Sequence, residues 1–275
     1  MPDHLLVEVR GDFTVLICVY AKDDPNLFLL AMQSIFSNTL LPKAVVLVVD
    51  GLVPKSLHDT ILFYERNYSV KVIRLNENRG FVAALNEGLQ HVETEWVIRA
   101  DADDYNLESR FSVLNKHMTS DLDLIGSFVA EKDEHGSVYC IKKVPLRSQD
   151  ISSLLRKRNP FIHPSVAYRV EDVRRVGGYP DVELREDYAL WASMIANGAR
   201  VRNIPDVLVQ MSFGDRGFQR RKGGAVLRAE VKLQKHLLKL GLTSPAHALF
   251  FGVLRCSVLT LPSAFIKVIY SKVLR

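Results

Sequence analysis

Apolar residues in the first 120 positions of the chain follow two alternating patterns. Short, nearly continuous apolar runs rich in β-branched residues are typical of strands that are buried on both faces. The longer segments between them carry apolar residues at helical spacing. The runs cover residues 13–20, 44–51, 70–75 and 95–104, and the helical segments cover residues 26–39, 56–67, 81–92 and 108–118. This alternation predicts an α/β fold with a mostly parallel sheet flanked by helices.

The pattern is less regular in the second half. Residues 123–145 are typical of two strands around a turn at 134–136, and the proline-bounded segment 159–169 mixes strand and loop signals. A helix is predicted from Asp187 to Ala196, and Gly198 closes it. In parallel sheets, ligands bind beyond the carboxyl ends of the strands, so functional residues are expected at that edge.

Composition places the chain among folded globular proteins. Of its 275 residues, 48% are apolar and 24% are charged, which is the usual balance for such proteins. Its three cysteines, Cys18, Cys140 and Cys256, are too far apart for a metal motif or a disulfide framework. The first residues lack the pattern of a signal peptide. We therefore expect a cytoplasmic protein.

The C-terminal segment, residues 215–275, differs in charge from the rest of the chain. No acidic residue follows Glu230, whereas basic residues continue to the end: Lys232, Lys235, Lys239, Arg255, Lys267, Lys272 and Arg275. Its apolar stretches are interrupted and fall short of the ~20 residues that cross a bilayer. This pattern favours amphipathic helices lying on a membrane surface, with a helix packed on the preceding domain as the alternative. Nucleic acid is not an expected partner, because no base-stacking module is evident.

Three aspartates crowd into four positions where the fourth apolar run ends: Asp101, Asp103 and Asp104. Alternate side chains at a strand end point the same way, so these carboxylates can hold a divalent ion together with phosphate oxygens. A calcium-binding EF-hand loop is excluded, because Asn106 and Ser112 stand where it needs glycine and glutamate. A phosphatase of the haloacid-dehalogenase type, with an aspartate nucleophile, and a solvated turn with helix-capping acids remain as alternatives.

Several motifs follow one another in a recognisable order. They are "VLICVYAKDDPNLFLLAMQSIFSNT", "VVLVVDG", "NENRGFVAALNEGL", "RADADD", "NPFIHPSVAYR", "GGYP" and "REDYALWASMIANG". This ordered set, over residues 13–210, resembles the family 2 glycosyltransferases, whose nucleotide-sugar-binding fold is called GT-A. The tail beginning "RRKGGAVLRAEVKLQKHLLKLGL" is similar to bacterial transferases for capsule, exopolysaccharide (amylovoran-type) and O-antigen assembly.

The resemblance implies a set of donor-binding residues. Tyr20 would stack on the uracil of a UDP-sugar, with Cys18 beside the base. Asp50 would accept a hydrogen bond from the base. Arg79 would lie near the uracil or the diphosphate, and Asp101 would face the nucleoside and ribose.

The resemblance also implies a metal and a catalytic base. Asp103 would bind Mn²⁺ or Mg²⁺, and Asp104 would lie behind it. Asp187 would be the base that takes the proton from the acceptor hydroxyl, although a helix-capping role is its alternative. Glu186 would orient the acceptor or the base. His163 would line the acceptor pocket, with an ordinary packed histidine as the alternative.

The expected function is metal-dependent, inverting transfer of a single hexose from a UDP-sugar to a polyprenyl-diphosphate-linked saccharide in bacterial surface polysaccharide synthesis. The Gln-x-x-Arg-Trp element of processive synthases is missing, which favours single-sugar addition. A sugar nucleotidyltransferase is a further alternative, but it would need a glycine-rich loop after the first strand. We expect residues 1–214 to form the catalytic domain and residues 215–275 to place the protein on the inner face of the plasma membrane. Within the domain, 13–120 would bind the nucleotide and 121–214 the acceptor.

Overall fold

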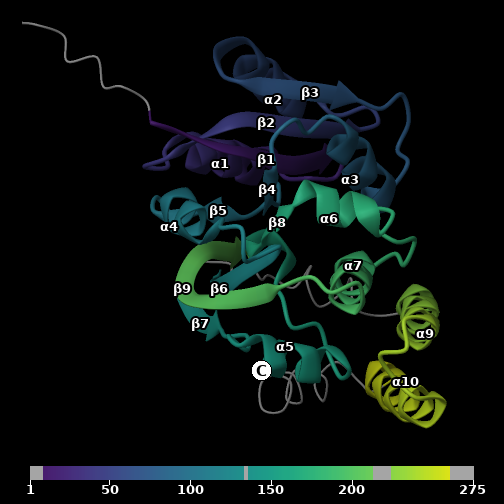
Figure 1. Ribbon diagram of the computed structural model, residues 1–275. Coiled ribbons are helices and arrows are strands. Elements are labelled where there is room, and N and C mark those ends of the chain that lie inside the picture. The colour runs from purple at the N-terminus through teal and green to yellow at the C-terminus, as the bar shows by residue number, and fades with distance from the viewer. Residues whose placement is uncertain (1–8, 133–135, 213–223, 261–275) are drawn as a thin grey trace, which may run out of the picture.

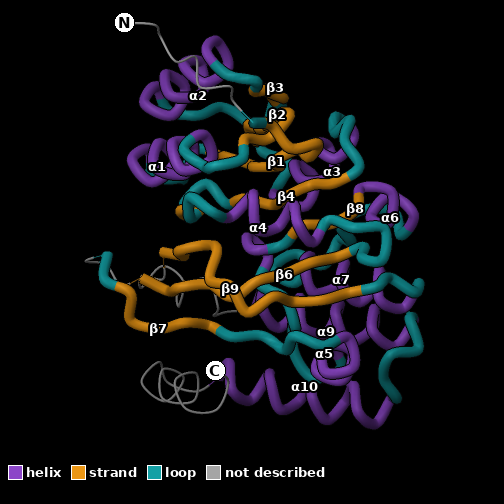
Figure 2. The backbone as a smooth tube through the Cα atoms, turned by 60° about the vertical axis from the view of Figure 1, so that its left-hand side comes forward, coloured by secondary structure: helices purple, strands orange, loops and turns teal. Residues whose placement is uncertain are grey.

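A nine-stranded sheet runs through the part of the chain that the structure, a computed structural model, describes: residues 9–132, 136–212 and 224–260 (Figure 1). The strand order is β3-β2-β1-β4-β8-β6-β9-β5, and β7 pairs with β6 outside this row. Helices cover both faces of the sheet (Figures 1 and 2). The predicted α/β architecture of a sheet flanked by helices is therefore confirmed.

The first half forms the parallel part of the sheet. Strands β1 to β4 pair in parallel, each at a position that the apolar runs predicted. The strands are β1 (Arg10–Tyr20), β2 (Leu41–Asp50), β3 (Val70–Arg74) and β4 (Trp96–Ala100), and the helices are α1 (Pro25–Phe36), α2 (Lys55–Asn67), α3 (Phe81–Gln90) and α4 (Arg110–His117). Parallel strands end at a common edge, so Tyr20, Asp50 and Ala100 bring the loops that follow them together.

The second half makes the sheet mixed. Strand β8 runs antiparallel to both β4 and β6, whereas β9 is parallel to β6 and antiparallel to β5. The elements are β5 (Tyr105–Asn106), β6 (Leu124–Lys132), β7 (Val138–Lys142), β8 (Ala167–Arg169), β9 (Val201–Ser212), α5 (Ser148–Leu155), α6 (Val170–Arg175), α7 (Glu186–Ala196), α9 (Gly224–Lys239), α10 (Pro245–Thr260) and the 3₁₀ turn η1 (His163–Ser165). The predicted turn between β6 and β7 includes residues outside the described ranges.

The core lies in two layers, because successive residues of a buried strand point to opposite faces. On β1, Leu16 and Cys18 pack on one face with α3, α7 and α9, while Val15 and Ile17 pack on the other with α1, α2 and α4. Both layers draw on strands that are apolar throughout, as expected for a sheet covered on both sides. The loops at its carboxyl edge are thereby held on a rigid frame.

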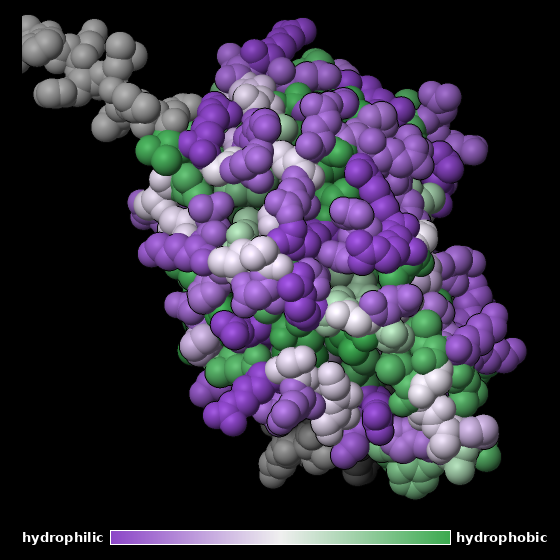
Figure 3. All heavy atoms as spheres, in the orientation of Figure 1, coloured by the Kyte–Doolittle hydropathy of each residue, from purple (hydrophilic) through white to green (hydrophobic). Residues whose placement is uncertain are grey.

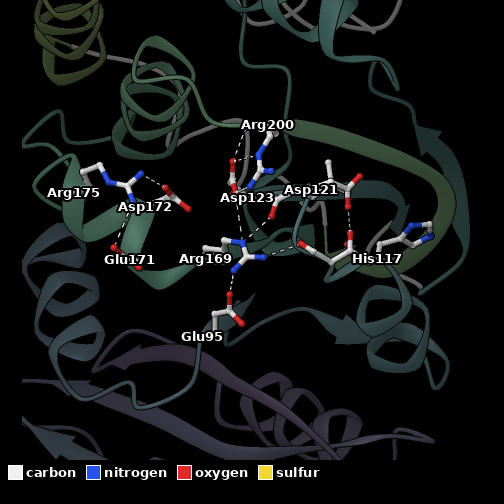
Figure 4. Close-up of polar contacts among 11 residues, drawn as sticks. Glu95, His117, Asp121, Asp123, Arg169, Glu171, Asp172, Arg175 and Arg200 are labelled. Atoms are coloured by element: carbon white, nitrogen blue, oxygen red, sulfur yellow. Dashed lines mark hydrogen bonds and ion pairs between the residues drawn. The ribbon is translucent and has the colours of Figure 1, made fainter.

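An ion network ties the second half of the sheet together (Figure 4). Arg169 on β8 pairs with Glu95, and its Nε lies 3.4 Å from the Oδ1 of Asp123. The guanidinium of Arg200 donates to both oxygens of Asp123, at 3.0 and 2.6 Å. These hydrogen bonds lower the pKa of Asp123 although its burial opposes the shift. The network joins the starts of β4, β6 and β9, away from the carboxyl edge of the parallel strands.

Helix α9 packs against α7, and α10 packs on α9 (Figures 1 and 2). Leu233 and Leu237 of α9 are fully buried in the same core layer as α7. Among the helices that the structure describes, none has both the length and the apolar character that crossing a membrane requires. The first helix of the basic C-terminal segment is thus part of the core of the domain.

Candidate active site

Three carboxylates meet just beyond the end of β4. Each of Asp101, Asp103 and Asp104 offers one oxygen, and these oxygens lie within 4.8 Å of one another. Asp101 and Asp103 are partly exposed, whereas Asp104 is buried. Carboxylates this close repel one another, so their charge requires compensation.

Two buried arginines supply part of that compensation. Arg99, on β4, donates to the carbonyl oxygen of Leu16 at 3.1 Å and pairs with Asp101. Arg110, on α4, donates to the carbonyl oxygens of Arg99 and Pro164 at 2.7 and 2.6 Å. Burial lowers the pKa of Arg110 to about 9, and the charge of Asp104 opposes that shift.

The aspartate cluster fits a divalent cation. Carboxylate oxygens are the ligands that Mg²⁺ and Mn²⁺ prefer. The three oxygens converge, two of the side chains are open to solvent, and the arginines lie behind the cluster. Asp103, the predicted ligand, is therefore placed where it could hold a cation together with its two neighbours.

Four of the predicted donor-binding residues lie at or near the ends of β1 and β2. Cys18 is buried, which raises the pKa of its thiol to about 12 and leaves it a neutral apolar group. Tyr20 ends β1 half-buried, and its backbone N–H donates to the Oδ2 of Asp23 at 2.9 Å. The side chain of Arg79 is 51% exposed, and its guanidinium lies 3.6 Å from the Oε2 of Glu87.

Asp50 anchors the loop before α3. Its two oxygens accept hydrogen bonds from the backbone N–H groups of Arg79 and Gly80, at 2.7 and 3.0 Å. The next residue, Gly51, has a φ of 83°, and a Cβ there would lie 2.7 Å from the backbone nitrogen of Asn78. Asp50 therefore has a structural role in shaping this loop, and its contact with the base stays a prediction.

Glu186 and Asp187, called the acid pair from here on, are the first two residues of helix α7. Asp187 accepts hydrogen bonds from the Nδ2 of Asn159 and from the N–H of Tyr188, both at 2.7 Å. Burial raises the pKa of Asp187 and, with the adjacent charge of Asp187, raises that of Glu186 to about 7. The negative charge of Asp101 also raises the pKa of Glu186, so the ionisation of Glu186 depends on the charge of the aspartate cluster. A carboxyl that titrates near neutral pH is suited to acid–base work.

The loop before the acid pair holds a strained residue. Leu184 has a φ of 68°, in the left-handed region that branched side chains avoid. Arg185 follows as the N-terminal cap residue of α7, and its guanidinium donates to the carbonyl oxygen of Leu184 at 3.0 Å. Strain of this kind is often found at functional sites.

His163 lies inside an aromatic cluster. Its Nε2 is 3.0 Å from the hydroxyl of Tyr179, and its ring packs edge-on against Phe81 and Trp191. Burial, together with the charge of Arg99, lowers the pKa of His163 well below its ordinary value, so the ring is neutral. The structure therefore places it in the core beside the site, and its predicted contact with the acceptor stays a prediction.

Comparison with known proteins identifies the family. The model of glycosyl transferase family 2 matches residues 14–176, more than half of the chain. The chain belongs to glycosyltransferase family 2. Among the relatives of this family 2 glycosyltransferase, the UDP-Gal:alpha-D-GlcNAc-diphosphoundecaprenol beta-1,3-galactosyltransferase of Escherichia coli is 38% identical over 96% of each chain. The amylovoran biosynthesis glycosyltransferase AmsE of Erwinia amylovora is 32% identical over 94% of this chain and 98% of its own.

Solved structures confirm the GT-A fold of the glycosyltransferase. The mannosyltransferase PcManGT from Pyrobaculum calidifontis, in complex with GDP-Man and Mn²⁺, matches with a TM-score of 0.61 at 18% identity, over 95% of this chain and 80% of that one. Residues 1–349 of S. aureus TarS, in complex with UDP-GlcNAc, match with a TM-score of 0.64 at 16% identity, over 86% and 69%. Membership of glycosyltransferase family 2 identifies the protein as a glycosyltransferase. It excludes the two alternatives that the sequence had left open, a phosphatase and a sugar nucleotidyltransferase.

Sequence reasoning missed Arg99 and Arg110. Arg99 is the only charged residue of β4, whose five residues are all buried. A lone arginine in such an apolar strand, two positions before an aspartate, could have indicated that Arg99 is buried and pairs with that aspartate. Arg110 had no comparable signal, because its partners come from three different elements.

Proposed function

We propose that this glycosyltransferase moves a single hexose from a UDP-sugar to a saccharide carried on a polyprenyl diphosphate. The observation that supports this most is the placement of two acidic groups: the aspartate cluster directly after β4, and the Glu186–Asp187 pair that begins α7. The charge of Asp101 raises the pKa of Glu186, as expected for groups that serve one site. The relative from Escherichia coli, similar over nearly its whole length, has a name that gives UDP-Gal as donor and a diphosphoundecaprenol-linked sugar as acceptor.

In this proposal the donor binds along the ends of β1, β2 and β4, within residues 13–120. Tyr20 and Cys18 contact the uracil, Asp50 and Arg79 form the loop around it, and Asp101 faces the ribose. Asp103 would hold Mn²⁺ or Mg²⁺, with Asp104 behind it. When bound, the cation offsets the negative charge that develops on the leaving diphosphate.

The acid pair carries out the proton transfer, with the acceptor bound within residues 121–214. Asp187 takes the proton from the acceptor hydroxyl as its oxygen bonds to the anomeric carbon and the bond from that carbon to the diphosphate breaks. The hydrogen bonds from Asn159 and Tyr188 leave each carboxylate oxygen of Asp187 a free lone pair in a fixed direction. Glu186 orients the acceptor or the base, and attack opposite the leaving group inverts the configuration.

Helix α10 brings the enzyme to the membrane that carries the acceptor. Its exposed apolar residues lie three to four positions apart or side by side, so they share one face: Leu249, Phe250, Val253 and Leu254. Figure 3 shows apolar side chains among polar ones at the lower right of the molecule, where α10 lies. No acidic residue follows Glu230 in the sequence, which suits an anionic bilayer. The proposed location is the inner face of the plasma membrane.

Two exposed phenylalanines offer a matched test of docking. Phe250 on α10 and Phe63 on α2 are 62% and 53% exposed, and each packs edge-on against one neighbouring ring with centroids 5.2 Å apart. Phe250→Glu should lower co-sedimentation with phosphatidylglycerol vesicles about tenfold, since a buried phenylalanine contributes ~1.5–3 kcal/mol. Phe63→Glu should leave it unchanged. Equal binding by both variants would remove α10 from the docking surface.

The function itself is tested by UDP release. The purified protein is incubated with Mn²⁺, a panel of UDP-hexoses and a synthetic N-acetylglucosaminyl diphospholipid. We expect one UDP-hexose to give acceptor-dependent UDP release and a lipid product heavier by one hexose. Release of inorganic phosphate, or no lipid product with any UDP-hexose, would contradict the proposal.

A further inference from the structure

Helix α9 packs against α7, the helix that begins with Glu186 and Asp187 (Figure 1). The Nε2 of His236 lies 2.8 Å from the Oγ of Ser193 and 3.2 Å from the carbonyl oxygen of Ala189. Leu233 and Leu237 are fully buried against the same layer. Any displacement of α9 therefore changes the packing around the middle of α7.

Glu230 is the last acidic residue of the chain, and it lies on the buried face of α9. Its side chain is 1% exposed. A carboxylate in that position is costly unless it is paired and hydrogen-bonded. Gln234 donates to its Oε1 at 2.8 Å, and the Nε of Arg185 lies 3.7 Å from its Oε2. Hydrophobic burial alone would have favoured an apolar residue there.

Arg185 connects Glu230 to the acid pair. It directly precedes Glu186 in the sequence, and its guanidinium also holds the carbonyl oxygen of the strained Leu184. The charge of Arg185 lowers the pKa of both Glu186 and Asp187. The guanidinium of Arg185 is thus paired with Glu230 of α9 and acts electrostatically on the two carboxyls that begin α7.

We propose that Glu230 is a positioning residue for the reaction: through Arg185 it fixes the loop before α7 and the orientation of Glu186 and Asp187. The role rests on the proposed function, because it assumes that this pair serves sugar transfer. Glu230 itself contacts neither donor nor acceptor. In this way the C-terminal segment contributes to catalysis as well as to location.

The charge of Glu230 predicts the direction in which the pH dependence of kcat should shift when that charge is removed. The charged groups that act on the pair are Arg185 beside it, Asp101 at the end of β4 and Lys142 on β7. Removing the charge of Glu230 leaves Arg185 less offset, so the pKa values of the pair fall. Because the base must be deprotonated, the acid limb of the kcat profile should then move to lower pH.

Glu230→Gln tests the role, since it keeps the shape of the side chain and removes only its charge. With the UDP-hexose and the diphospholipid acceptor, we expect kcat to fall about tenfold, as displacement of a base costs up to about a hundredfold. The KM for the UDP-hexose should stay unchanged, and the acid limb should move to lower pH. Lys235→Ala on the same helix is the control, because Lys235 is exposed to solvent.

A wild-type kcat and pH profile in Glu230→Gln, or an equal loss in Lys235→Ala, would overturn the role of Glu230. If Glu230→Gln does not fold, Arg185→Gln provides the test. Loss of the positive charge of Arg185 should raise the pKa values of Glu186 and Asp187, so the acid limb of the kcat profile should move to higher pH while the KM for the donor stays unchanged. An unmoved acid limb in that variant would also overturn the proposal. Failure of the wild type to transfer a hexose is a different result, which contradicts the proposed function.

Discussion

Replacing Arg110 by methionine removes one of the two buried positive charges behind the aspartate cluster. Arg110 is fully buried and donates hydrogen bonds to two backbone carbonyl oxygens, those of Arg99 and Pro164. In Arg110→Met, both carbonyls and the Oδ1 of Asn106, which also accepts from Arg110, lose a hydrogen bond in a place that water does not reach. Each such loss costs ~1–3 kcal/mol, and relief from burying the guanidinium offsets part of it. We expect a net destabilisation of about 3 kcal/mol.

The loss should appear in thermal unfolding. For a protein of this size, 1 kcal/mol corresponds to ~2–4 °C, so Tm should fall by roughly 6–12 °C. Lys116→Met is the control, because Lys116 is exposed on the same helix. A second measurement separates charge from packing, since the cluster without Arg110 is more negative and should gain more thermal stability from added Mn²⁺ than the wild type does.

Two results would refute this reasoning. A Tm within about 2 °C of wild type would mean that the buried guanidinium contributes little net free energy. A lowered Tm without a larger gain from Mn²⁺ would assign Arg110 a packing role only, with no electrostatic part in the site.

Three further substitutions probe the site. Asp187→Asn should bind the UDP-sugar with wild-type affinity by calorimetry, yet lose ~10²–10⁴-fold in kcat, the usual contribution of a general base; wild-type turnover would contradict this role. Glu186→Gln should be more stable than wild type at pH 8, with the difference vanishing toward pH 4.5. The raised folded-state pKa, about 7, means that ionising Glu186 costs stability between those limits; chemical denaturation across pH measures it, and equal stability at pH 8 would contradict it. Asp50→Asn can accept from only one of Arg79 and Gly80, so it should lose about 1–3 kcal/mol in denaturation and bind UDP more weakly; an unchanged protein would show that the loop does not depend on this carboxylate.

The parallel half of the fold could be predicted because its strands are apolar throughout and its helices have regular spacing. Strand β9 could not, because Pro205 and Asp206 interrupt its apolar pattern. The structure accommodates them at a register shift, where Ile204 pairs with Ser127 and Val207 with Phe128. A proline is tolerated at such a bulge, since a ladder hydrogen bond is already missing there.

The sequence motifs indicate the acids of the candidate site and several of the residues around them, but not the groups that hold the acids in place. Asp103 and Asp187 stand in motifs that the sequence displays, whereas the groups that set their charge and orientation come from distant positions. Asn159 reaches Asp187 across 28 positions, and Arg110 reaches Pro164 across 54. The apolar spacing of α9 predicted a helix but not its partner, because only the tertiary contact with α7 selects which surface it covers.

The most direct measurement of the central claim is hexose transfer to the diphospholipid acceptor with and without a divalent cation. It compares the wild type, Asp103→Asn, and Asp59→Asn as a matched change at a surface residue whose side chain is 55% exposed. We predict that the wild type and Asp59→Asn transfer with Mn²⁺, stop in excess EDTA and recover when Mn²⁺ is restored, whereas Asp103→Asn is inactive throughout. Transfer by the wild type that continues in EDTA, or wild-type activity of Asp103→Asn, would contradict the account.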